Sequence, residues 1–217
     1  MGAWQGRRAL IISAAPCENL DYVKKILKRY PDIVVICADG GAKYARKLNI
    51  KPDVIVADFD SSENTIECGE VIKLTPEKDD TDTQHAALLA LERGCKELIL
   101  VCAIGGRIDH MLSNLLLCEQ VYELGGHLSV IDEQNIIMLH AGGQMKFARQ
   151  ELKKYISLIP LDEKLEGVTM KGLKYPLENA VLTRKKIISV SNDPVSDDVL
   201  IEISSGKALV ILADDKT

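Results

Sequence analysis

The stretch IVVICADGGA, residues 33–42, decides the fold class of this chain. Its apolar first half predicts a strand that is buried on both faces, and a glycine turn and a short helix follow directly. The same order recurs downstream, where a strand over 97–103 runs into Gly105-Gly106 and a helix over 112–124. Continuous apolar strands that alternate with helices predict an α/β domain with a Rossmann-like, mostly parallel sheet.

The flanking sequence extends this pattern and then changes character. Further expected strands are 9–13, 54–56, 71–74, 127–131 and 136–140, and further expected helices are 20–30, 42–48 and 83–93. Beyond Gly142-Gly143 helical spacing disappears, and short strand-like segments are expected at 155–159, 165–170, 182–183, 187–190, 199–203 and 208–212. We therefore expect an α/β domain over 1–145, followed by a small antiparallel β-sandwich domain over 150–217.

Composition narrows the class of protein. The net charge is −5 and the isoelectric point about 5.5, and no block of Lys and Arg stands out, which argues against nucleic acid or a membrane surface as the main partner. Six cysteines form no CxxC pair, so we expect reduced and mostly buried thiols rather than a disulfide framework or a zinc site. No apolar run has the length of a signal peptide or a membrane span, so we expect a cytoplasmic protein.

Two polar clusters follow the expected strands of the first half. Asp39-Gly40-Gly41 comes directly after the strand 33–37, where glycines allow a phosphate or ribose to approach the backbone, although a tight turn explains them equally well. Asp58 and Asp60 lie two residues apart, so in an extended backbone both carboxylates point to one side, roughly 6–7 Å apart at Cα. Such oxygen donors suit Mg²⁺, whereas the plainer interpretation is a solvated acidic loop.

Two more clusters open the later helices. Residues 77–83, EKDDTDT, begin the helix that runs to residue 93, and they hold more carboxylates than helix capping requires. Residues 105–110, GGRIDH, place Arg107 where its planar fork could bind phosphate. Because ligands of open parallel sheets bind beyond the carboxyl ends of the strands, we expect all four clusters at one edge, forming a site for a metal and a triphosphate.

These segments also resemble a known family, the thiamine pyrophosphokinases. The resemblance rests on short motifs in a fixed order: ADGGA (38–42), PD and DFDSS (52–62), PEKDDTD (76–82), GGRIDH with Asn114, ISLIPL (156–161), GLKYPL (172–177) and VSN (190–192). It covers nearly the whole chain. It implies transfer of the pyrophosphoryl group of ATP to thiamine, with an ATP- and Mg²⁺-binding catalytic domain first and a thiamine-binding, dimerisation domain second. It also implies a homodimer with the active site at the subunit interface.

The resemblance assigns roles to particular positions. It implies Mg²⁺ ligands at Asp58, Asp60 and Asp82, and a place near the thiamine pyrimidine for Ser191 and Asn192. We expect catalytic roles for Asp58, Asp60, Asp79, Asp82, Arg107 and Asp109, ATP contacts from Asp39, Gly40, Gly41, Ser61, Thr81 and Arg107, and a thiamine contact from Asp109. Two features depart from the family pattern: Ala57 stands where members usually have glycine, and the only tryptophan, Trp4, lies outside the second domain.

The residues alone leave other functions open. The same α/β site would suit a pyrophosphokinase for another heterocyclic methanol, such as a pterin, although the VSN segment favours thiamine. A non-catalytic nucleotide- or thiamine-binding regulator would need the fold without a complete metal cluster. A magnesium-dependent phosphohydrolase would need a water-activating His/Asp pair, and none is evident in the sequence. In the favoured reaction the thiamine hydroxyl attacks the β-phosphorus of ATP and AMP leaves, with Asp109 or Asp79 as a candidate proton acceptor.

Overall fold

The protein is described here from a computed structural model that covers residues 2–57, 67–74, 80–186 and 188–215. The chain divides into two compact units, Met1–Glu133 and Gln134–Thr217. The division lies before the boundary expected at 145–150, because β7 (Asn135–His140) and β8 (Gly143–Ala148) both pair with strands of the second unit.

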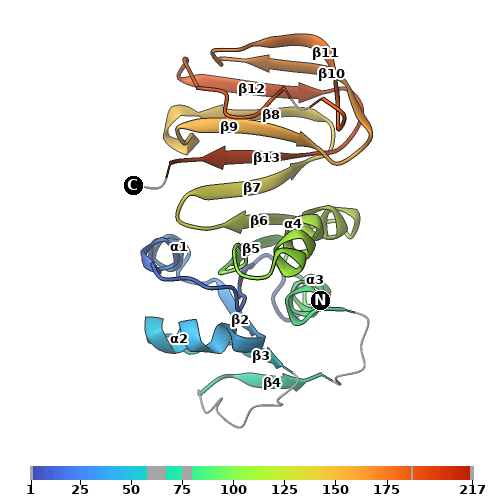
Figure 1. Cartoon of the computed structure of the whole chain (residues 1–217). Helices are drawn as coiled ribbons and strands as arrows, with labels where there is room; N and C mark the ends of the chain where they lie inside the picture. Colours follow the sequence, from blue (N-terminus) through green and yellow to red (C-terminus); the bar gives the residue numbers. More distant parts are fainter. Residues whose placement is uncertain (1, 58–66, 75–79, 187, 216–217) are drawn as a thin grey trace. The chain divides into compact units, whose positions relative to one another are not determined.

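The first unit contains a parallel sheet with strand order β4-β3-β2-β1-β5-β6 (Figure 1). The strands are β1 (Arg8–Ile12), β2 (Val34–Ala38), β3 (Val54–Ala57), β4 (Glu70–Lys73), β5 (Glu97–Val101) and β6 (His127–Ile131). Neighbouring strands in this order pair in parallel, from Val56↔Ile72 at one side to Val101↔Ile131 at the other. The four apolar residues Ala9 to Ile12 are fully buried, as expected for a strand covered on both faces.

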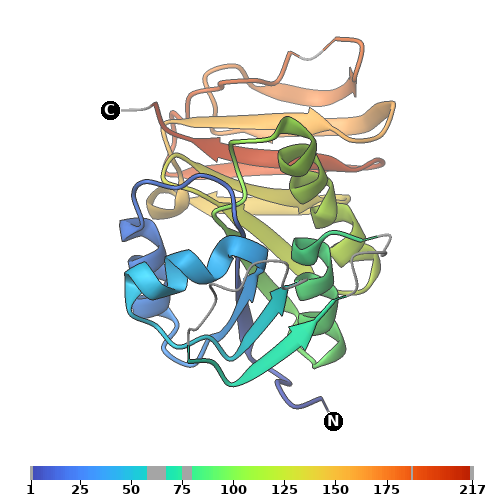
Figure 2. The same cartoon turned by 60° about the horizontal axis from the view of Figure 1, so that its bottom comes forward.

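Helices cover both faces of this sheet. α1 (Asp21–Arg29) and α2 (Ala42–Leu48) lie on one face, and α3 (Asp82–Glu92) and α4 (Ile108–Glu123) lie on the other (Figures 1 and 2). α1 packs Val23, Ile26 and Leu27 into the core while its lysines face outward, and the chain leaves the helix before Pro31. A one-turn helix, η1 (Asp39–Gly41), joins β2 to α2.

The second unit is an antiparallel sandwich. One sheet has the order β7-β13-β9 and the other β11-β10-β12-β8. The remaining elements are η2 (Arg149–Glu151), β9 (Tyr155–Pro160), β10 (Lys164–Lys171), β11 (Leu177–Thr183), β12 (Asp198–Ile203) and β13 (Ala208–Ala213). Residues of both sheets, such as Leu158 and Ile201, share one buried core. The predicted fold class, an α/β parallel-sheet unit followed by a β-sandwich, is therefore confirmed.

Several local predictions were wrong. The strand β8 was not predicted; it begins within the Gly142-Gly143 break, where the two glycines take φ angles of 96° and 79°. α4 begins at Ile108 rather than at residue 112, so the second half of the GGRIDH motif, residues 108–110, is the start of the helix. Residues 188–190 form no strand, and the buried Ser189 instead hydrogen-bonds Leu158 through its side chain and its carbonyl.

The cysteines are mostly buried, as predicted. All six lie within the described residues and are free, and four of them are buried: Cys37, Cys95, Cys102 and Cys118. Burial raises the pKa of the Cys37 and Cys102 thiols to about 12. Within the part of the chain that the structure describes, no helix has both the length and the apolar composition needed to cross a membrane.

Candidate active site

The parallel strands of the first unit bring three loops to one edge of the sheet. Residues 13–16 follow β1, Asp39 follows β2, and residues 103–107 follow β5. These loops and the first turns of α4 enclose a cavity of about 420 Å³. Asp39 and Arg107, two of the residues predicted to contact ATP, line this cavity together. Both residues therefore lie at the sheet edge beyond the carboxyl ends of the strands, where the sequence predicted them.

Contacts with β1 hold the Asp39-Gly40-Gly41 turn in place. Gly41 packs against the backbone of β1, because a Cβ placed there would lie 2.0 Å from the Ile12 carbonyl oxygen. The left-handed backbone angle falls on Asp39, with φ 47°, and not on a glycine. Gly41 is thus needed to seat the turn against β1, and the exposed Asp39 side chain is presented at the cavity.

The loop after β5 carries the arginine of the site. Gly106 has φ 69°, and a Cβ there would lie 2.8 Å from the ring of Pro16, so glycine lets this loop close on the loop after β1. Arg107 is the N-cap of α4 and donates from Nε and Nη2 to the two carboxylate oxygens of Asp109, at 3.2 and 2.6 Å. This pairing, together with the His110 amide, lowers the pKa of Asp109 to about 2.

The start of α3 lies beside this edge. Thr81 caps the helix by accepting a hydrogen bond from the Gln84 amide at 3.2 Å, and the half-buried Asp82 is the first helical residue. Asp80, just before the cap, lies 3.2 Å from Nδ1 of His85 one turn further on. The capping prediction for this segment is correct. The acidic residue Asp79 lies outside the described residues.

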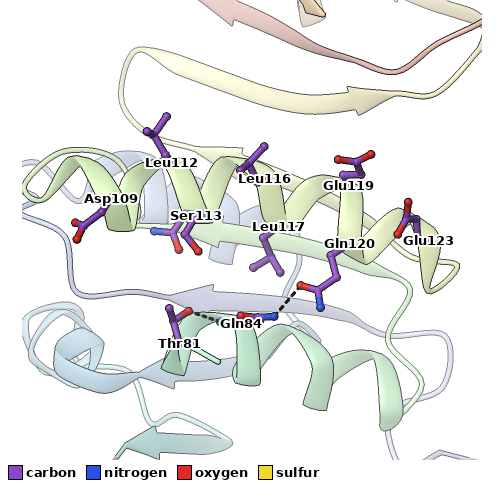
Figure 3. A pocket seen from close by; sticks show the side chains of 11 residues that line it. Thr81, Gln84, Asp109, Leu112, Ser113, Leu116, Leu117, Glu119, Gln120 and Glu123 are labelled. Carbon is purple, nitrogen blue, oxygen red and sulfur yellow. Dashed lines mark hydrogen bonds between the residues drawn. The ribbon is translucent and has the colours of Figure 1, made fainter. Parts of the chain in front are cut away.

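A second pocket, of about 720 Å³, lies between α3 and α4 (Figure 3). Thr81 and Asp109 line the end at which both helices start, and Gln84 donates to Gln120 across the pocket at 3.0 Å. Figure 3 shows Leu117 directed toward α3, whereas Leu112 and Leu116 point away from it, and both of these leucines are about half exposed. The pocket joins two predicted site residues, Thr81 and Asp109, that belong to different helices.

Asn114 supports the cavity wall from α4. Its side chain is 6% exposed and donates to the Ala103 carbonyl at 3.0 Å, which ties the helix to the loop after β5. Buried amides of this kind are expensive to leave unpaired, so Asn114 fixes how the Gly105-Gly106 turn meets α4. His110, one turn earlier, is exposed and also lines the cavity.

The two residues predicted to lie near thiamine belong to the second unit. Ser191 is exposed and has φ 55°, and its amide donates to Ser157 Oγ at 2.9 Å. Asn192 is 5% exposed, and its main chain exchanges hydrogen bonds with Ile156 at 2.9 and 3.0 Å. Ser191 is therefore presented at the surface, whereas Asn192 is held inside the unit.

The metal ligands can be followed only in part. Asp58, Asp60 and Ser61 lie outside the described residues, so the first turn of α3 supplies the one predicted ligand with a position, Asp82. Among the described residues, no three His, Cys, Asp or Glu side chains lie close enough to hold a metal ion. The predicted donor set is all carboxylate oxygen, which is the chemistry that Mg²⁺ prefers.

Sequence reasoning missed the loop after β1 and a buried pair behind it. Residues 14–16, Ala-Ala-Pro, line the cavity with backbone and small side chains, and so they carry no polar signal in the sequence. Ser13 and Thr83, 70 residues apart, hydrogen-bond at 2.8 Å between their hydroxyl oxygens. The only signals in the sequence for this part of the site were the end of the strand β1 and the N-cap of α3.

Both parts of the chain match known protein families. Residues 26–130 match the family described as "Thiamin pyrophosphokinase, catalytic domain", and residues 144–210 match "Thiamin pyrophosphokinase, vitamin B1 binding domain". A thiamine pyrophosphokinase of Bacillus subtilis (strain 168) is 30% identical over 187 residues, which span 83% of this chain and 87% of that protein. The chain belongs to the thiamine pyrophosphokinase family. The resemblance seen in the short motifs is thereby confirmed.

Solved structures of thiamine pyrophosphokinases share the fold. A crystal structure of the enzyme from Bacillus subtilis superposes with a TM-score of 0.84 at 26% identity, covering 97% of this chain and 100% of that one. A thiamin pyrophosphokinase family protein from Enterococcus faecalis gives a TM-score of 0.79 at 26% identity, with coverages of 97% and 100%. The helices and strands of this chain thus follow the same fold as in these proteins.

Ala57, which departs from the thiamine pyrophosphokinase pattern, fits its place in the structure. It is the last residue of β3, it is buried, and its carbonyl accepts from the Leu74 amide at 3.0 Å. Its φ is not positive, so the backbone at this point does not require glycine. With alanine at position 57, the end of β3 keeps ordinary strand geometry.

Proposed function

We propose that this chain transfers the pyrophosphoryl group of ATP to the hydroxyl of thiamine, giving thiamine diphosphate and AMP. The observation that carries the proposal is that the two family matches fall on different structural units, 26–130 within the first and 144–210 within the second. The edge cavity with Asp39 and Arg107 lies in the part that matches the catalytic domain.

ATP would bind at the strand-end edge of the first unit. We assign its contacts to Asp39, Gly40, Gly41, Ser61, Thr81 and Arg107. Arg107 is 73% exposed in its side chain, so its guanidinium can turn from Asp109 to a phosphate with little rearrangement of its surroundings. Asp39 offers a carboxylate from a fixed turn, which suits a ribose hydroxyl.

Magnesium would be held by Asp58, Asp60 and Asp82. Bound there, it supplies positive charge that offsets the charge of the triphosphate. In the sequence, Asp58 and Asp60 follow β3 and Asp82 is the first residue of α3.

The acceptor hydroxyl attacks the β-phosphorus, and the bond from this phosphorus to the oxygen of the α-phosphate breaks. A proton acceptor works best with a pKa near the working pH, so Asp109, with its pKa lowered to about 2, is a poor one while Arg107 holds it. Asp79 is the better candidate. A loose phosphoryl-transfer transition state needs little help from a base, so positioning and charge carry most of the rate.

Product analysis tests this function. The protein is incubated with ATP, Mg²⁺ and thiamine, and the products are identified by mass. AMP with thiamine diphosphate is the expected result, and ADP with thiamine monophosphate would contradict it. A parallel incubation with a hydroxymethyl pterin tests the alternative acceptor, and phosphate release without thiamine would indicate the hydrolase.

We also propose a homodimer whose active site lies at the subunit interface, as the family resemblance implies. Light scattering should give twice the chain mass of 23.9 kDa. A fully active monomer would show that one chain builds the whole site. Six free thiols favour the reducing cytoplasm as the place where the enzyme works.

A further inference from the structure

The start of α3 is held by the hydrogen-bonding side chains of three of its first four residues, counted from the N-cap. Thr81 accepts from the Gln84 amide, Thr83 bonds Ser13 at the end of β1, and Gln84 bonds Gln120 of α4. Successive helical residues point about 100° apart, so these contacts hold the turn from three directions. Asp82 is the remaining residue of this turn, and its direction is set by them.

The Ser13–Thr83 contact is the innermost of the three. The two side chains are 6% and 7% exposed, and their hydroxyl oxygens lie 2.8 Å apart. Ser13 is itself fixed, because its amide donates to the Val101 carbonyl of β5 at 3.0 Å. The pair therefore connects the turn that carries Asp82 directly to the central strands of the sheet.

We infer that Ser13 and Thr83 are positioning residues that aim the Asp82 carboxylate at the metal–nucleotide site. The inference rests on the proposed function, in which Asp82 binds magnesium. Neither hydroxyl is placed to react, because each is buried and bonded to the other. Their effect reaches the site through α3: a ligand carboxylate that is free to shift binds metal less well, even though the fold persists.

The test compares variants that remove or keep the hydroxyl. Thr83→Val and Ser13→Ala each remove one partner, and the double variant leaves no orphaned hydroxyl, so it should fold even where a single variant fails. Thr83→Ser keeps the bond. Thr169→Val is the matched control, since Thr169 accepts a hydrogen bond from the Asn179 amide at 3.1 Å in the β10–β11 hairpin of the second unit and has no predicted role in the site.

Binding of the Mg²⁺ complex of α,β-methylene-ATP is measured by calorimetry, with the melting temperature alongside. We expect the dissociation constant to rise about tenfold in Thr83→Val and in the double variant, the size seen when a residue supporting a metal ligand is lost. Thr83→Ser and Thr169→Val should stay near wild type. In the double variant, the melting temperature should recover relative to Thr83→Val, whereas the dissociation constant should not.

A double variant that binds the nucleotide complex within twofold of wild type would overturn the inference, since the pair would then serve stability alone. The binding measurement needs no turnover. A wild-type protein that binds the complex but makes no AMP and thiamine diphosphate would therefore contradict the proposed function. The dissociation constants of the variants would still test the role of the Ser13–Thr83 pair.

Discussion

The side-chain amide of Asn192 is hydrogen-bonded at both ends to the main chain of Tyr175. Its Oδ1 accepts from the Tyr175 amide at 3.0 Å, and its Nδ2 donates to the Tyr175 carbonyl at 2.8 Å. The Tyr175 ring itself is 63% exposed. Asn192, predicted to lie near thiamine, thus also holds the GLKYPL segment (172–177) of the second unit in place.

Asn192→Ala should weaken both thiamine use and stability. Losing the amide removes two partly buried hydrogen bonds to the main chain of Tyr175, which costs about 1 kcal/mol of unfolding free energy. The KM for thiamine should rise, with the KM for ATP nearly unchanged, as steady-state kinetics would show. Tyr175→Phe keeps every main-chain bond, so urea unfolding should find it as stable as wild type. An Asn192→Ala protein with a changed ATP KM and a normal thiamine KM would contradict the thiamine assignment.

Asp82→Asn should abolish turnover while leaving the fold intact, because the amide keeps the shape but loses the charge that holds Mg²⁺. The loss of one acidic group at a helix start costs only about 0.3–1 kcal/mol of stability. Asp21→Asn is the matched control, since Asp21 also occupies the first turn of a helix, α1, and has no predicted role in the site. Product formation is measured by mass and stability by thermal melting. Near-normal turnover in Asp82→Asn would remove it from the metal site.

Gly41→Ala and Gly40→Ala should differ sharply although they are neighbours. At position 41 the new methyl would collide with the Ile12 carbonyl at 2.0 Å, whereas at position 40 it would make an ordinary 3.4 Å contact with Ala14 Cβ. We expect a loss of about 3 kcal/mol for Gly41→Ala, as for overpacking in a core, and less than about 1 kcal/mol for Gly40→Ala. Urea denaturation measures both. Equal losses would mean that the turn does not rest on β1 as described.

Stability should decline as the pH falls, in part through His140. Its ring is 3% exposed and donates from Nε2 to the Ile201 carbonyl at 3.2 Å, and burial lowers its pKa below the ordinary value of 6.5. Because the unfolded chain then binds the proton more readily, His140 contributes full stability above pH 6.5 and loses it progressively below. The slope from this group is at most about 1.4 kcal/mol per pH unit.

His140→Gln tests this assignment, because glutamine can still donate to the Ile201 carbonyl but does not titrate. Urea unfolding at pH 7.5 and pH 5.5 should show a smaller loss of stability in the variant than in wild type. Identical pH dependence in the two proteins would show that His140 does not contribute.

The sequence predicted the fold best where burial is complete. β2 and β5 begin within one residue of their predicted starts, because an uninterrupted apolar run has no other stable place than the centre of a sheet. β11 (Leu177–Thr183) was reduced to 182–183, because its exposed Glu178 and Asn179 look like a turn. Edge and surface strands carry too little apolar pattern to be seen without their partners.

The site was predictable as a place but not as a set of contacts. Strand order put Asp39 and Arg107 at one edge, since parallel strands end together. The pairing of Arg107 with Asp109 depends on the geometry of the loop after β5. The pairing of Ser13 with Thr83 joins residues that lie 70 positions apart. Neither pairing can be predicted from the spacing of residues in the sequence. The aspartates Asp58, Asp60 and Asp79 remain predictions.

The place of β13 has a consequence for how the protein is made. This strand, Ala208–Ala213, pairs with β7 on one side and β9 on the other, yet it is the last strand in the described chain. During translation, the first unit has all six of its strands once Ile131 has left the ribosome. β7 and β9, in contrast, are followed by about fifty to seventy further residues before β13, the strand that pairs with both, is made. We therefore expect the nascent second unit to expose unpaired strand edges until β13 has been made, which makes it the part most in need of chaperone protection.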